Sequence, residues 1–178
     1  MATVNLLPNG AGINNFTLST GSDVAALLQD DASTPAGDSN YLSATVAGKN
    51  CFLDLDNFTE DHSSIDGVQI VLRAGNGART QTYDIETQLL PAGIGSAYYT
   101  EYTGTETSNR FYKTHTFTNR LAADGSTAWN NTLIDALRLY VKLDAHSGGT
   151  FKFTQAYVII TYTEPLATDD AIFFGTNF

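Results

Sequence analysis

The stretch STAWNNTLIDALRLYVKLDAHSGGTFKFTQAYVIITYT, residues 126–163, decides the fold class of this chain. Alternating apolar and polar residues predict a strand over 136–144, although the first apolar residues of this run also fit a helical spacing. The run over 150–163 is apolar at both parities, which is typical of a central strand or of one that meets a partner chain. We therefore expect two core strands joined as a hairpin through the turn at 146–149.

Further strand signals precede this stretch. Alternation predicts a strand over 50–58, with Cys51 and its alternate leucines facing the core. Two more strands, 67–74 and 80–90, flank Gly75-Asn76-Gly77, a sequence that favours a hairpin turn. Residues 23–28 fit one helical turn. With about eight to ten short strands separated by turn signals, we expect an all-β antiparallel sandwich of the jelly-roll kind.

The charge and cysteine content exclude several classes of protein. The formal net charge is −10 and no basic tract occurs, so nucleic acid and anionic membranes are poor partners. The one cysteine, Cys51, cannot form an internal disulfide and fits a small core residue. The first 15 residues lack the features of a signal peptide. We expect a protein that is made in the cytoplasm and not secreted.

The two ends of the chain differ from the middle. Residues 1–14 and 165–178 show no strand period, and Pro165 ends the sheet, so we expect an N-terminal arm, a sandwich domain over 15–164 and a C-terminal arm. Exposed apolar side chains in such arms make sense if they dock on a neighbouring subunit. The expected interface residues in the arms and on the outer side of the last strand are Leu6, Leu7, Ile13, Tyr157, Ile159, Ile172, Phe173, Phe174 and Phe178.

An ordered set of segments resembles a β-sandwich domain of tailed-bacteriophage virion and appendage proteins. The segments are DDASTPAGDSNY at 30–41, FLDL at 52–55, IDGVQIVLRA at 65–74, STAW at 126–129 with IDAL at 134–137, and AYVIITY at 156–162. The match covers about residues 30–163. The chain departs from the family pattern at Asn130 and at Leu139-Tyr140, which affects the local turn geometry. The resemblance implies a virion part without saying which one.

Catalytic and metal-binding patterns are weak. Asp54 and Asp56 share one strand face, but the sequence surrounds them with no sugar cleft, so a solvated face is the simpler interpretation. The three histidines share no metal-ligand spacing. Asp30, Asp31 and Asp38 fit no calcium-loop template. We expect no enzyme activity, no catalytic residue, no metal and no cofactor, and we expect Trp129 to be a structural plug at a sheet corner.

The favoured hypothesis is a structural virion protein, most simply a capsid decoration or cement protein on the particle surface. Its partner would be the major capsid protein, and a homotrimer would suit local three-fold positions. The alternative is a carbohydrate-binding adhesion module of a phage tail or fibre. Tyr98, Tyr99, Tyr102 and Tyr112 cluster in the sequence, and the alternative predicts that the Tyr98–Tyr112 region lines an exposed groove that binds a surface glycan.

Overall fold

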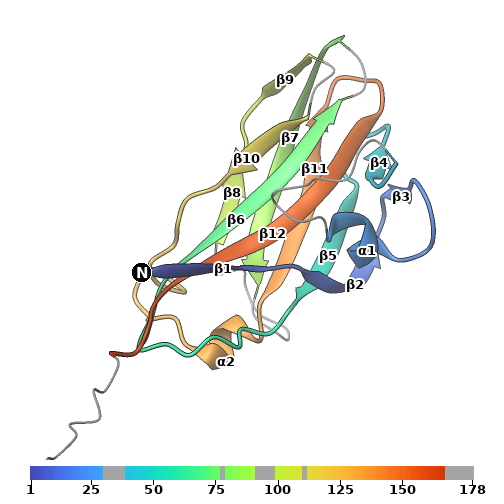
Figure 1. The fold of residues 1–178 in the computed structure, drawn as a ribbon. Coiled ribbons are helices and arrows are strands. Elements are labelled where there is room, and N and C mark those ends of the chain that lie inside the picture. Colours follow the sequence, from blue (N-terminus) through green and yellow to red (C-terminus); the bar gives the residue numbers. More distant parts are fainter. Residues whose placement is uncertain (30–38, 77–78, 91–98, 110–111, 167–178) are drawn as a thin grey trace, which may run out of the picture.

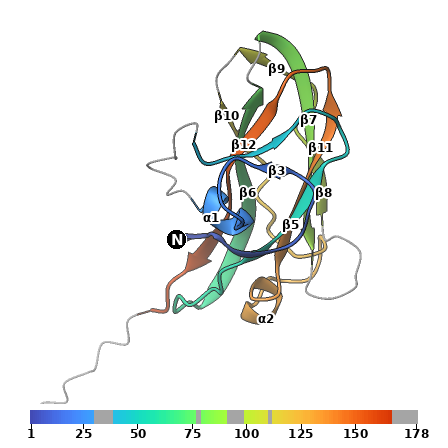
Figure 2. The same cartoon turned by 90° about the vertical axis from the view of Figure 1, so that its right-hand side faces the viewer.

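Two antiparallel β-sheets lie face to face in the computed structural model (Figure 1). The structure describes residues 1–29, 39–76, 79–90, 99–109 and 112–166. In this part of the chain, twelve strands form two six-stranded sheets, which we call the front sheet and the back sheet after their places in Figure 1. Figure 2 shows the two layers edge-on, with β6 and β12 in one and β7 and β11 in the other.

The front sheet is centred on the long strand β12 (Phe151–Thr163), which pairs along its whole length with β6. On its other side, β12 pairs with β4 over residues 151–153 and with β1 over residues 158–162. The remaining members are β10, which pairs with β6, and β3, which pairs with β4. The bounds are β1 (Ala2–Leu6), β3 (Thr17–Leu18), β4 (Leu42–Ala44), β6 (Ser64–Asn76) and β10 (Lys113–Thr116).

The back sheet is centred on β11 (Arg138–His146), which lies between β5 and β7. Beyond β5 lies β2, and the far side of β7 pairs with β8 and β9. The bounds are β2 (Pro8–Asn14), β5 (Asn50–Leu55), β7 (Arg79–Leu90), β8 (Tyr99–Tyr102) and β9 (Glu106–Asn109).

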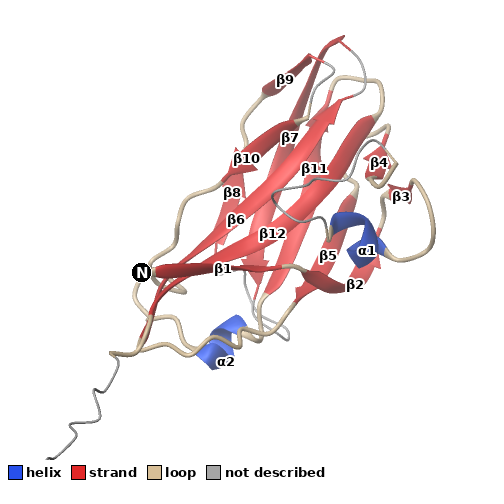
Figure 3. Cartoon of the chain, viewed as in Figure 1, coloured by secondary structure: helices blue, strands red, loops and turns tan. Residues whose placement is uncertain are grey.

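Two short helices accompany the sheets (Figure 3). The helix α1 (Val24–Leu28) begins after Asp23, whose carboxylate accepts hydrogen bonds from the backbone N–H groups of Ala25 and Ala26. This helix packs against β2 and β12 and confirms the predicted helical turn. The helix α2 (Asn131–Ile134) is capped by the Asn130 side chain and occupies the predicted turn at 131–135.

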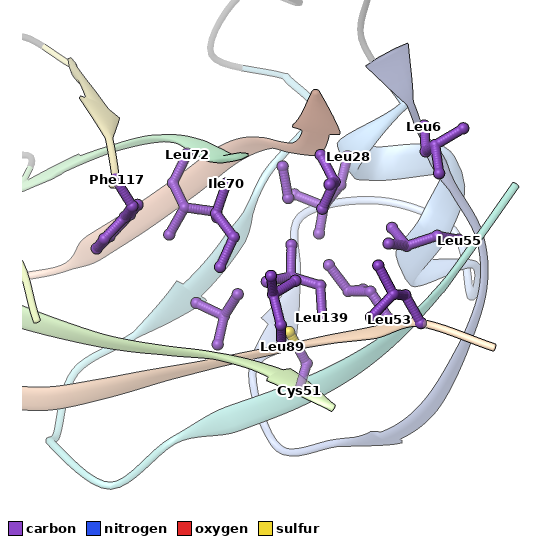
Figure 4. Close-up of a cluster of buried hydrophobic side chains, with 14 of the residues drawn as sticks. Leu6, Leu28, Cys51, Leu53, Leu55, Ile70, Leu72, Leu89, Phe117 and Leu139 are labelled. Carbon is purple, nitrogen blue, oxygen red and sulfur yellow. The ribbon is translucent and has the colours of Figure 1, made fainter. Parts of the chain in front are cut away.

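The core lies between the two sheets. Successive side chains of a strand point to opposite faces, so every second side chain of each long strand points into this space. Leu53 of β5, Leu72 of β6 and Leu139 of β11 are fully buried, as their period of two predicted. Figure 4 shows that the core also takes Leu6 from β1 and Leu28 from α1. Cys51 is fully buried too, and burial raises the pKa of its thiol to about 12, which confirms its expected structural role.

Both expected hairpins are wrong. The strands β6 and β7 belong to opposite sheets, and so do β11 and β12. In each case the chain reverses as expected, but the second strand crosses to the other layer instead of pairing with the first. The physical reason is that β6 and β12 form a long antiparallel ladder with each other, and β7 and β11 form another. The fold class is confirmed: the protein is an all-β antiparallel jelly-roll sandwich.

The N-terminal segment 1–14, expected as an arm, is extended but lies within the sandwich. Residues 2–6 form β1 of the front sheet and residues 8–14 form β2 of the back sheet, so the first strands bridge both layers. Leu6 is 2% exposed and packs in the core, so it is not the surface residue that an interface requires.

Described helices include none that is long and apolar enough to cross a membrane.

Candidate functional site

The outer surface of the back sheet carries an unusual combination of aromatic and charged side chains. Alternation sends Phe52 and Asp54 of β5 outward between buried neighbours. On β11 the outward residues are Arg138, Tyr140 and Lys142. We call this surface the back-sheet face, and it comprises Asn50, Phe52, Asp54, Glu86, Gln88, Leu90, Thr100, Tyr102, Arg138, Tyr140 and Lys142.

The strand register arranges these side chains in rows across the sheet. The middle row runs from Phe52 through Tyr140 and Gln88 to Thr100, as successive cross-strand partners. Its two aromatic rings lie 4.8 Å apart between centroids, with their planes inclined by 51°. Both residues are half-buried, because each ring packs on its neighbours and leaves part of its surface to solvent. The row therefore presents a ring pair followed by an amide and a hydroxyl group.

One neighbouring row joins Asp54, Arg138 and Leu90. The Arg138 side chain donates a hydrogen bond of 2.8 Å to the Asp54 carboxylate, and its guanidinium lies 5.4 Å from the centroid of the Phe52 ring. Gly12 of β2 lies so close that a Cβ atom there would be 2.7 Å from an Arg138 nitrogen. The glycine thus leaves room for the guanidinium, which borders the aromatic pair.

The other neighbouring row joins Asn50, Lys142 and Glu86. The Lys142 ammonium lies 2.9 Å from Glu86 and 2.6 Å from Asp144, and hydrogen bonds to Asp144 and Glu86 raise the pKa of Lys142. Gln88 donates a 2.6 Å hydrogen bond to the other Glu86 oxygen. These contacts hold the Glu86 carboxylate at 7% exposure, and every cation of the face is paired with an acid.

The hydroxyl group of Tyr140 remains protonated at neutral pH. Burial is the main reason why its pKa is raised, and the charge of Glu86 adds to this, while Lys142 and a hydrogen bond with Asn50 act in the opposite direction. The Tyr140 hydroxyl can therefore donate as well as accept at the surface. The back-sheet face combines apolar ring surface with fixed donors and acceptors in adjacent rows.

A second surface lies where the predicted tyrosine region reaches the sheet edge. Residues 101–103 and Glu106 from the back sheet, with residues 113–118 of the front sheet, line a groove of about 420 Å³. We call it the edge groove. Tyr102 lies at this groove and is 54% exposed. A groove in this region is what the carbohydrate-binding alternative predicted.

The other described tyrosines of the cluster, Tyr99 and Tyr112, do not line this groove. Tyr99 lies under the Arg120 guanidinium, 4.2 Å from its ring centroid, and its hydroxyl donates to the Ala122 carbonyl and accepts from Gly125. Tyr112 lies beside Arg73. Tyr98 is outside the described residues. Of the three described tyrosines of the cluster, Tyr102 is the one that borders the groove.

The remaining predicted interface residues scatter over the molecule. Ile13 is 64% exposed on β2, and Leu7 is half-buried between β1 and β2. Tyr157 is 9% exposed and Ile159 is half-buried on the outer side of β12. Ile172, Phe173, Phe174 and Phe178 lie outside the described residues. No common surface of these residues emerges in the described part of the chain.

The structure gives Trp129 a structural role and places Asp54 on the back-sheet face. Trp129 is 4% exposed, and its indole N–H donates a 2.8 Å hydrogen bond to the Arg120 carbonyl, as expected of a plug. Asp54 belongs to the back-sheet face as the partner of Arg138. Asp30, Asp31 and Asp38 are outside the described residues. The described ranges contain no group of three or more acids, histidines or cysteines placed to hold a metal ion.

Sequence reasoning missed the back-sheet face. The alternation of β5 placed Phe52 outward with Asp54, and that of β11 placed Tyr140 outward between two cations. Each observation alone fits a solvated strand. What joins them is the pairing of β5 with β11, strands separated by more than 80 residues, and no local pattern reveals that register.

No protein-family model matches the sequence, and no curated protein matches it significantly. Solved structures of similar fold include a CBM36 domain of a xylanase from the hindgut metagenome of Trinervitermes trinervoides, at 10% identity and TM-score 0.44 over 92% of this chain and 100% of that one. They also include the C-terminal CBM6 of LamC, a laminarinase from Zobellia galactanivorans, at 9% identity and TM-score 0.46 over 90% and 100%.

A cyclase from Fischerella sp. TAU is similar at 14% identity and TM-score 0.48, over 92% of this chain and 86% of that one. Carbohydrate-binding modules and a cyclase thus share the sandwich. At such identities and TM-scores these structures carry no argument about ligand or activity.

Proposed function

We propose that this protein is a non-catalytic carbohydrate-binding module that holds a neutral polysaccharide on its back-sheet face. The observation that carries the proposal is the partly exposed ring pair of Phe52 and Tyr140 between two rows of paired charges. The similar solved structures share only the fold with this chain.

The ring pair supplies the apolar part of sugar recognition. A pyranose has a face of C–H groups, which packs against the electron-rich face of an aromatic ring. Because the two ring planes are inclined by 51°, one flat ligand cannot stack on both rings at once. Two consecutive sugar residues that are turned relative to each other can do so. The geometry therefore favours a twisted oligosaccharide chain over a single flat ligand.

The flanking rows supply the polar part. Asp54 with Arg138 lies in the row on one side of the ring pair, Lys142 with Glu86 lies in the row on the other side, and Gln88 extends the middle row. Their ion pairs and hydrogen bonds hold these groups in place before a ligand arrives, which lowers the entropy cost of binding. Carboxylate and amide oxygens accept from sugar hydroxyls, while guanidinium and amide N–H groups donate to them.

The charge distribution favours a neutral ligand. Arg138 is paired with Asp54, and Lys142 with Glu86 and Asp144, so each cation of the face already has an acidic partner. The chain as a whole has a net charge of −10, which repels polyanions. We therefore expect weak binding to acidic polysaccharides.

The arrangement also suits binding rather than hydrolysis. Asp54 has a side chain that is 49% exposed, and its partner is a cation rather than a second catalytic acid. Glycosidases hold their two carboxyl groups across a cleft at the scissile bond. On this open sheet face the acids serve as fixed hydrogen-bonding groups.

The capsid decoration hypothesis gains no support from the described residues. It rested in part on two apolar arms, and the N-terminal one is built into both sheets. Among the described residues expected to meet the capsid protein or a second subunit, Tyr157 and Ile159 lie together on the outer side of β12, and the others lie elsewhere.

Affinity electrophoresis through soluble polysaccharides tests the proposal. The probes are a xylan, a β-glucan and a galactomannan, with polygalacturonate as the acidic comparison. We expect at least one neutral polymer to retard the protein and the acidic one not to do so. Tyr140→Ala and Phe52→Ala should each weaken binding by about tenfold or more, as central aromatic contacts do.

Tyr41→Ala is the matched control. Tyr41 is also half-buried and lies under a cation, with the Lys152 ammonium 4.0 Å from its ring centroid, but it belongs to the front-sheet side. This variant should bind as the wild type does. Wild-type migration unchanged by every neutral polymer, or full binding by both back-sheet variants, would refute the proposal.

A further inference from the structure

The edge groove is lined by polar side chains, among them the buried His115, that take no part in the proposed function. It opens between β8 and β9 of the back sheet and β10 of the front sheet, which lie at the same edge of the molecule (Figure 1). These short strands are the last ones at this edge of each sheet. No further strand lies beyond them in the described part of the chain to cover the space between the two layers. The resulting volume of about 420 Å³ is in the range of small-molecule sites.

His115 forms part of the groove lining and is 7% exposed. Its Nε2 atom lies 3.0 Å from the Tyr83 hydroxyl, which is its one hydrogen bond among the described residues. Its Nδ1 atom lies 4.0 Å from the Oε1 atom of Glu106, too far for a direct hydrogen bond. A buried imidazole thus has one nitrogen with a hydrogen bond and one, Nδ1, that has none among the described residues.

The protonation of this pair follows from its surroundings. Burial lowers the pKa of His115 and, together with the charge of Glu106, raises that of Tyr83 to about 12. A protonated Tyr83 donates to Nε2, which assigns the ring proton of neutral His115 to Nδ1. An N–H donor and a carboxylate acceptor then face each other across the 4.0 Å gap.

A hydroxyl group fits this gap, because it can accept from Nδ1–H and donate to Glu106 at the same time. With two hydrogen bonds of roughly 2.8 Å, its oxygen would sit beside the line that joins the two atoms. A carboxylate or phosphate oxygen lacks the proton that Glu106 requires. An ammonium group lacks the acceptor that Nδ1–H requires.

The charges around the gap are already neutralised. The Lys113 ammonium lies 2.6 Å from the other Glu106 oxygen, and Arg120 pairs with Glu101, which also accepts from the Thr118 N–H. An ionic ligand would have to break one of these pairs. Tyr102 borders the groove, and its register opposite Glu86 places its side chain on the back-sheet face.

We propose that the edge groove is a second ligand site, distinct from the back-sheet face, which takes one neutral sugar residue whose hydroxyl bridges His115 Nδ1 and Glu106 Oε1. The site requires no glycan on the back-sheet face, so it stands independently of the proposed function.

NMR titration of ¹⁵N-labelled protein tests this assignment. The probes are glucose, xylose, galactose and mannose, with glucuronate as the charged comparison, each titrated to about 50 mM so that even a ~1 mM complex is saturated. We expect at least one neutral sugar to shift the amides of residues 101–106 and 113–118 and the imidazole ¹⁵N resonances of His115. Glucuronate should bind more weakly than glucose.

Variants separate the two sites. Glu106→Gln should weaken the groove complex by about fivefold or more, a loss of about 1 kcal/mol. The exposed-residue control Val46→Ala should leave it unchanged. A protein carrying both Phe52→Ala and Tyr140→Ala should retain the groove shifts.

Three outcomes would overturn the assignment. The first is the absence of groove shifts with all four neutral sugars. The second is a set of shifts that the double back-sheet variant abolishes, since the sugar would then bind at the other face and the proposed function would stand alone. The third is tighter binding of glucuronate than of glucose, which would contradict the ligand class.

Discussion

Exposure, not residue type, separates the structural aromatic residues from the candidate ligand-binding ones. Trp129 is the single tryptophan and an attractive ligand platform by composition, but its ring is buried and its N–H is engaged with the Arg120 carbonyl. Tyr140 and Phe52 are ordinary strand residues that keep part of their ring surface at the solvent. The same distinction applies to His115, which burial turns into a neutral hydrogen-bonding group.

His115 predicts a pH dependence of stability. Burial lowers its pKa from 6.5 in the folded state, so the unfolded chain binds more protons below about pH 6.5 and the free energy of unfolding falls as the pH decreases. Glu106 opposes this shift, while Lys113 and burial act together, and Tyr83 contacts the ring. His115→Gln should flatten the decline between pH 6.5 and pH 5, as measured by urea unfolding at each pH.

The pH range of this measurement avoids the acidic residues. Hydrogen bonds lower the pKa of Asp66, mainly through Thr163, and that of Asp124, mainly through the Thr127 backbone. Their stabilising contributions are present above about pH 4 and are lost only as the pH falls further. A slope between pH 5 and pH 6.5 that is unchanged in His115→Gln would contradict the assigned role of the histidine.

Among the secondary-structure elements, α1 shows how packing sustains a segment that is too short to be stable alone. Its five residues are far fewer than an isolated helix needs. Four of them are buried, and Leu28 is fully enclosed in the core. The Asp23 cap satisfies two N–H groups of the first turn, so local and tertiary interactions cooperate.

Asp23→Ala should lower the free energy of unfolding by about 1 kcal/mol, because it leaves these N–H groups without their side-chain acceptor. Asp23→Asn should recover most of the loss, since its side-chain oxygen can accept the same bonds. Asp61→Ala, which removes an exposed carboxylate from the loop after β5, is the control. Thermal unfolding of the three variants measures the effect, and equal stability of Asp23→Ala and wild type would contradict the capping role.

In the molecule as a whole, the N-terminal segment ties the two layers together. β1 pairs with the central strand of the front sheet, and β2 follows at once in the back sheet. Removal of residues 1–7 would therefore strip a ladder from β12 and expose the space that Leu6 fills. An arm that only contacts other subunits would be dispensable for the fold.

Deletion of residues 1–7 should lower the free energy of unfolding by at least about 2 kcal/mol, the contribution expected from burying one leucine. The uncovered edge of β12 at residues 158–162 should also promote self-association. Chemical unfolding and light scattering measure the two effects. Leu6→Ala, which retains the ladder, should lose stability without associating. Unchanged stability of the truncated protein would support the arm interpretation instead.

The inward faces of β5 and β11 could be predicted from the sequence. Cys51 and Leu53 on β5, and Leu139 and Val141 on β11, are buried as the alternation indicates. The Asp23 helix start and the structural role of Trp129 were also readable. These features depend on a period of two or on neighbours within a few residues, so they are properties of the local chain.

Only the tertiary structure decided which strands pair. The turns after β6 and β11 signal chain reversal, but a reversal does not say whether the next strand pairs alongside or crosses to the opposite layer. That choice depends on competing ladders with distant strands. The pairing of β5 with β11 then brings Phe52 to Tyr140, and the opposed sheet edges bring His115 to Glu106. The sequence by itself determined the sandwich and its core, while the candidate sites arise from contacts between remote segments, which no local pattern encodes.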